Sequence, residues 1–191
     1  MSDYDLLDYI PVIGDLYRYG KLGYNIGAWL ANDSDSYNNR LLSNMTDSIN
    51  AAANSDDAMT ALGHVSEAVD YIHQFDTNNC KKYQLAMLYF LGARIFHLHA
   101  LCACMIYSGD LKELKNVGHT FSDASNYCSK VWSVDKTIFT SNRSLIDQIR
   151  AASDEKKKEI SESRSKWRMQ YRHLYKQKHP VKWYLGMWMF A

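Results

Sequence analysis

The chain has 191 residues and a mass of 22.1 kDa, and 47% of its residues are hydrophobic. A chain of this length fits one domain, residues 1–191, and buries a core without help from disulfides or metals. The formal net charge is +1, and the sequence contains no glycine-rich phosphate-binding loop. Nucleotide hydrolysis through such a loop is therefore not expected.

Charge is unevenly distributed along the chain. Residues 155–191 contain ten Lys and Arg and three Asp and Glu, which gives a formal charge of +7. Residues 1–154 contain twelve Lys and Arg and eighteen Asp and Glu, which gives a formal charge of −6. The domain is thus an acidic body, 1–154, joined to a basic carboxyl-terminal helix and apolar tail, 155–191. This asymmetry bears on binding partners and not on catalysis.

The predicted elements are all helices. The two prolines, Pro11 and Pro180, lie near the ends of the chain, and no strand-like alternation of any length occurs between them. Links of a few residues between the helices predict a single antiparallel bundle. In chain order, the six expected helices cover about 11–31, 37–53, 55–75, 81–107, 110–131 and 144–178.

Polar residues mark several predicted helix starts. Ser55, followed by two aspartates, is a good start for the third helix, and Asp110 with Glu113 resembles a capping box for the fifth. Ser144 with Asp147 starts the last region in the same way. Whether this region is continuous or broken near Ser153 is left open by the sequence.

The helix over 81–107 is apolar nearly all round. Between Leu85 and Tyr107 the only formally charged residue is Arg94, near the middle of a segment long enough to span a bilayer. A central Arg costs roughly 3 kcal/mol on membrane insertion. Burial at the centre of a bundle is therefore expected in preference to membrane spanning.

The first predicted helix carries a row of small residues, Gly23, Gly27 and Ala31, at four-residue spacing. Such a row lets another helix approach closely, in a membrane or in a soluble bundle. Just before it, residues 10–16 resemble the Ile-Pro-x-x-Gly-Asp motif that precedes toxin modules in bacterial polymorphic toxins. The likeness covers seven residues, so no residue role is taken from it.

Several His, Cys and acidic residues invite a metal or catalytic interpretation, but their spacing does not support one. No paired Cys or His clusters of the structural zinc kind occur, and no second Asp-x-x-His pattern accompanies the one in 70–73. No catalytic residue, metal or cofactor is predicted. The four cysteines are read as thiols, and the acidic amino terminus lacks the features of a secretory signal. A cytoplasmic location is expected, with peripheral membrane attachment as an alternative.

The carboxyl-terminal segment places cations beside aromatic rings. On a helix, the cations from Arg164 onward and the aromatics from Trp167 onward form two adjacent four-residue rows. Rings of this kind either complete the core or face a partner. The hypothesis is a non-catalytic interaction protein, and its expected contact residues are Arg164, Trp167, Arg168, Tyr171, Arg172, Tyr175, Lys176, Trp183 and Trp188.

Four kinds of partner remain open for this surface. A protein is favoured, and a second copy of the chain is a further alternative. The runner-up function is a membrane-docked or membrane-active protein, pore-forming or toxin-related, which uses the glycine row and the Trp-rich terminus at an anionic surface. Nucleic acid ranks third, because the sequence pI of 7.7 is low for a basic binder and no known motif is present.

Overall fold

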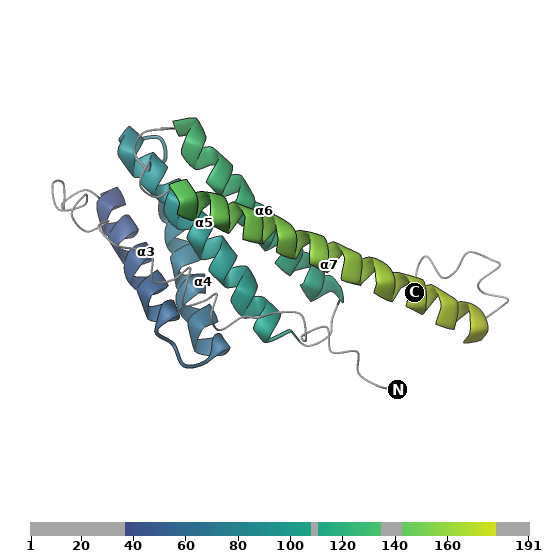
Figure 1. The fold of residues 1–191 in the computed structure, drawn as a ribbon. Helices are drawn as coiled ribbons and strands as arrows, with labels where there is room; N and C mark the ends of the chain where they lie inside the picture. Colours follow the sequence, from purple (N-terminus) through teal and green to yellow (C-terminus); the bar gives the residue numbers. More distant parts are fainter. Residues whose placement is uncertain (1–36, 108–110, 135–142, 179–191) are drawn as a thin grey trace.

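The structure, a computed structural model, describes residues 37–107, 111–134 and 143–178; at some positions near the carboxyl end of the last helix it describes the backbone alone. These residues form five helices and, within the described ranges, no strand (Figure 1). The helices are α3 (Tyr37–Ala53), α4 (Ala58–Gln74), α5 (Lys82–Met105), α6 (Leu111–Val134) and α7 (Arg143–Lys178). The predicted all-α bundle is therefore confirmed, and the predicted helix at 11–31 lies outside the described residues.

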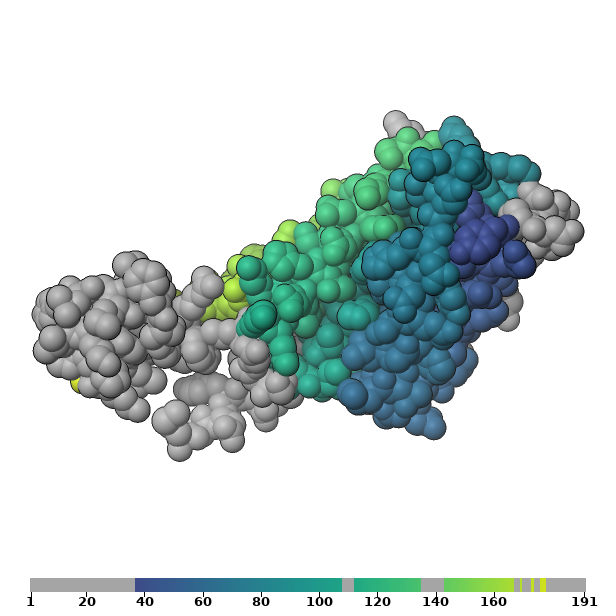
Figure 2. Space-filling model, turned by 180° about the vertical axis from the view of Figure 1, so that it is seen from behind, coloured from purple at the N-terminus to yellow at the C-terminus, as the bar shows by residue number. Residues whose placement is uncertain are grey.

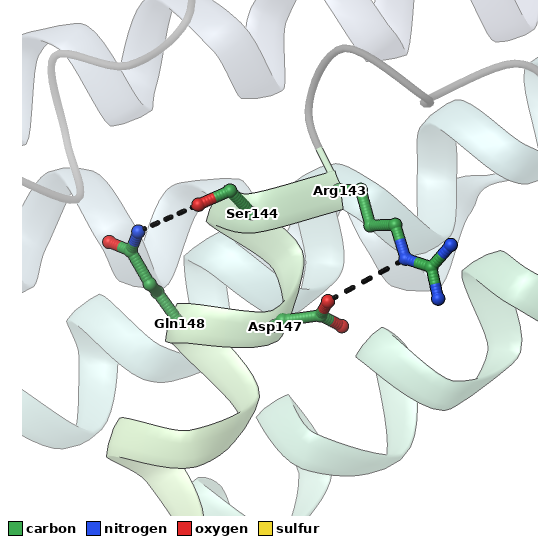
Figure 3. Close-up of polar contacts among 4 residues, drawn as sticks. All are labelled: Arg143, Ser144, Asp147 and Gln148. Carbon is green, nitrogen blue, oxygen red and sulfur yellow. Dashed lines mark hydrogen bonds and ion pairs between the residues drawn. The ribbon is translucent and has the colours of Figure 1, made fainter.

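The helix boundaries follow the sequence signals with two corrections. Asp57, and not Ser55, is the N-cap of α4, since its carboxylate accepts hydrogen bonds from the Thr60 backbone N–H at 2.9 Å and hydroxyl at 2.6 Å. At the start of α7, Arg143 forms an ion pair with Asp147 at 3.8 Å (Figure 3). Helix α7 begins at Arg143, one residue before the predicted start, and within its first turn Ser144 accepts a hydrogen bond from Gln148 at 3.0 Å.

Helix α5 is the centre of the bundle. It packs against α3 and α4 on one side and against α6 and α7 on the other (Figure 1). In the part of the chain that the structure describes, it is the one helix long and apolar enough to cross a bilayer, and 78% of its apolar window is buried by the rest of the protein. The prediction that this helix is core is confirmed.

Arg94 lies inside this core, fully buried, with its guanidinium carbon 5.8 Å from the centre of the Phe90 ring. Burial lowers its pKa to about 10, which still leaves the side chain protonated at neutral pH. A cation over an aromatic face is attracted by the ring quadrupole.

Polar contacts join α3 to the link between α4 and α5 and to the start of α5. Asn38 donates to the backbone oxygen of Asp76 at 3.0 Å, and the Asp76 N–H donates back to the Asn38 side chain at 3.1 Å. Gln84 donates to the buried side chain of Asn39 at 2.7 Å and accepts from the Lys81 N–H at 2.8 Å. These buried amides are hydrogen bonded, as buried polar groups must be to avoid a desolvation cost.

Helices α5 and α6 approach closely at Gly92. A Cβ atom at this position would lie 2.3 Å from the Tyr127 ring, which packs edge-on against Tyr89 with 5.7 Å between ring centres. Glycine is required here because the ring occupies the space of any side chain. This contact brings α5 and α6 close together.

Replacing Gly92 with Ala tests the contact. The added methyl group must displace the Tyr127 ring, and overpacking of this kind destabilises by about 1–3 kcal/mol. Gly63→Ala is the matched control, since a Cβ at this exposed helical position meets nothing within 4 Å. The control should gain stability, by up to about 1 kcal/mol. Urea unfolding followed by circular dichroism measures both changes, and equal effects would contradict the packing described.

Candidate functional site

Helix α7 extends past the helix on which it packs. The Lys157 ammonium donates to the Ser122 hydroxyl at 3.0 Å, and Ile160 lies opposite Gly118, so α6 and α7 run antiparallel. Each step toward the start of α6 is then matched by a step toward the end of α7, which puts Leu111 level with about residue 168. We call residues 168–178 the projecting end; at 1.5 Å per residue it is about 16 Å long (Figure 1).

The described side chains near the projecting end are exposed. Ile160 is the last buried residue described on α7, and beyond it Met169 has 61% of its surface exposed. The other exposed side chains described here are Lys166, His173, Lys176 and Gln177.

The charge of this end is not balanced along its own helix. Before it, cations and carboxylates alternate, and two ion pairs form, Lys156 with Glu159 at 2.8 Å and Lys158 with Glu162 at 4.0 Å. After Glu162 no further acidic residue follows, whereas 163–178 contains six Lys and Arg. The sequence of this end of α7 is therefore cationic.

The structure places seven of the nine predicted contact residues on one continuous helix, α7. Arg164 is half-buried and Lys176 is exposed. Five others lie on α7 at positions where the backbone alone is described: Trp167, Arg168, Tyr171, Arg172 and Tyr175. Trp183 and Trp188, and the helix-packing residues Gly23, Gly27 and Ala31, lie outside the described residues.

A buried polar contact fixes the first half of α7. His97 Nδ1 and Ser153 Oγ are hydrogen bonded at 2.8 Å, and the His97 ring packs edge-on against Phe121 with 5.6 Å between ring centres. One histidine thus joins α5, α6 and α7. Ser153, noted in the sequence only as a place where the helix could break, instead holds a continuous helix to the core. No sequence signal linked these residues, which are 56 positions apart.

The His97 environment keeps its ring neutral. Burial, and then the charge of nearby Lys156, lowers the pKa to about 4 from the ordinary 6.5. Serine and histidine are residue types that serve as nucleophile and general base in enzymes. Here both side chains are fully enclosed, with His97 1% and Ser153 0% exposed. The pair is therefore interpreted as structural.

The remaining candidates for chemistry are dispersed or enclosed. Among the described residues, no three His, Cys, Asp or Glu side chains gather as a metal site would require. All four cysteines are thiols. Burial raises the pKa of three of them, Cys102, Cys104 and Cys128, to about 12, and such thiols are poor nucleophiles. The fourth, Cys80, is half-buried in the link before α5.

Comparison with protein-family models, with curated proteins and with solved structures finds no match for this chain.

The His97 pKa predicts how stability depends on pH. Between about pH 6.5 and 4 the unfolded chain binds a proton that the folded chain does not, so the free energy of unfolding falls as the pH is lowered through this range. The full effect is roughly 3 kcal/mol for a shift of this size.

His97→Gln retains a polar group for Ser153 but does not titrate, and its stability should depend less on pH. Urea unfolding at pH values from 7 to 4 measures the free energy of unfolding of the unmodified chain and of this variant. His119→Gln, at an exposed position, is the control, and equal pH dependence in all three chains would contradict this account.

Proposed function

We propose that the chain is a non-catalytic interaction protein that binds a macromolecule, in the first place an acidic protein, through the basic and aromatic end of α7. The observation that carries the proposal is the projecting end itself. It extends about 16 Å past the helix that supports it, its described side chains are exposed, and its own helix supplies no carboxylate to neutralise it.

The residue types on this helix suit recognition of a carboxylate-rich surface. Arginine binds carboxylates through two parallel hydrogen bonds, and tyrosine and tryptophan supply large contact area at a small entropic cost. Arg168 and Arg172 are one helical turn apart, and Tyr171 and Tyr175 repeat the same step beside them. A partner helix or loop that carries acidic and apolar residues would match this arrangement.

A membrane surface is the second candidate. Its support is the apolar helix α5, which meets the length and composition of a membrane span, together with the Trp-rich sequence at 181–191. The burial of α5 inside the bundle favours the protein partner. Cosedimentation with anionic vesicles that weakens with added salt, or leakage of vesicle contents, would reverse this order.

Reversing two charges on α7 tests the protein-binding function. Arg168→Glu with Arg172→Glu replaces two attractive contacts by repulsive ones and should weaken partner capture by roughly tenfold or more. The measurement is quantitative affinity capture from the native host, followed by titration of the purified partner. Helicity should remain that of the unmodified chain.

Lys112→Glu with Lys115→Glu is the matched control for this experiment. It makes the same change in net charge at two exposed positions on α6. Capture that is lost only in the α7 variant supports the proposed surface. Equal capture by the unmodified chain and both variants would exclude it.

A further inference from the structure

The outer face of α4 carries an exposed strip that no described helix covers. We call Met59, Gly63, Glu67 and Asp70 the α4 strip; they follow one another at four-, four- and three-residue steps and therefore share a face of the helix. Met59 has 64% of its surface exposed, and a Cβ at Gly63 would meet nothing within 4 Å. The strip offers a large apolar side chain, an open gap and two carboxylates.

The charge around this strip is of one sign. Residues 41–80 contain six Asp and Glu and no Lys or Arg. Helix α4 with the links at its two ends is thus the acidic end of the bundle, whereas on α3 Arg40 offsets Asp47. A cationic surface is the natural complement of such an end.

Helix α7 carries a matching strip. Lys166, Met169, His173 and Lys176 are all exposed and recur at three-, four- and three-residue steps, so they also share one face. At 100° per residue, this α7 strip lies about 180° around the helix from the row of Trp167, Tyr171 and Tyr175. It is therefore a different surface from the one assigned to the partner above, with Lys176 at its edge.

The two strips are complementary in a parallel alignment. Placing Met169 over the gap at Gly63 brings His173 to Glu67 and Lys176 to Asp70, because both strips continue with a four-residue and then a three-residue step. A large apolar side chain then fills the position that lacks one, the Lys176 ammonium meets the Asp70 carboxylate, and the His173 ring lies beside the Glu67 carboxylate. Helices pack by inserting the side chains of one into the gaps of the other.

The strips cannot meet within one molecule. Helix α4 lies at one end of the described structure, and the projecting end of α7 points away from the other (Figure 1). The view from behind shows the same separation, with α3 and α4 in purple and blue on one side and the end of α7 emerging beyond α6 on the other (Figure 2). A contact between them requires a second copy.

We infer that the chain associates head to tail, with the α7 strip of one copy docked on the α4 strip of the next. The contact joins two different surfaces, so each copy retains one unused strip. Such a contact generates chains or closed rings and is not limited to dimers. Because the facing groups are charged and lie at the surface, added salt weakens the association.

Exchange of charges between the strips tests this inference. Sedimentation velocity on the purified full chain at low salt should show an average mass that rises with concentration beyond that of a dimer. Lys166→Glu with Lys176→Glu leaves two acidic strips on each copy, and Glu67→Lys with Asp70→Lys leaves two basic ones. Each variant alone should associate at least tenfold more weakly, and an equimolar mixture of the two should recover association.

Three further variants separate loss of association from loss of folding, from loss of the proposed function and from a change in net charge. Gly63→Leu fills the gap without contacting the core, so it should abolish association while the melting temperature is not lowered. Arg168→Glu with Arg172→Glu changes residues that lie about 100° around α7 from the centre of this strip, and this variant should associate normally even where it no longer captures the protein partner. Lys112→Glu with Lys115→Glu controls for net charge. A monomeric unmodified chain at low salt, or a mixture that stays monomeric, would overturn the inference.

Discussion

The structure depends on one constraint, the absence of a polar face on α5. Sixteen of its residues are buried, including Arg94 and His97, so solvent is excluded from nearly its whole circumference. One neighbouring helix cannot achieve this, and two helices on each side do. The amphipathic helices around it bury one face each and leave the other to solvent. Among the described residues, four helices together enclose this apolar one.

The same constraint explains why α7 is divided into two parts. Its first half has buried residues at three-, four- and seven-residue steps, Ile146, Ile149, Ser153 and Ile160, which cover α5 and α6. Once the start of α6 is reached, no described helix remains to be covered. The chain nevertheless continues as helix with a composition rich in cations and rings. Length beyond what the core requires is the feature on which the proposed recognition function rests.

Much of the fold could be predicted from the sequence, because the information is local. Periodic apolar residues and polar links located five helices, and the single charge in 85–107 identified the central one. What could not be predicted is the matching of distant side chains. The contacts of Asn39 with Gln84 and of His97 with Ser153 depend on helix rotation and register, which no local pattern specifies. The sequence predicted the candidate site as rows of cationic and aromatic residues on a helix. That α7 extends past α6 could be seen only from the structure, which pairs the two helices.

The link between α4 and α5 carries a thiol, Cys80, that can be labelled selectively. Cys80 lies there half-buried, with its Sγ donating to the Thr77 backbone oxygen at 3.4 Å, whereas the three other cysteines are enclosed in the core. Burial and nearby Asp76 raise its pKa, so alkylation proceeds faster in mildly alkaline buffer. A maleimide dye added to the folded chain therefore reacts at one position. Spectroscopic distances can then be measured from the acidic end of the bundle without replacing any native residue.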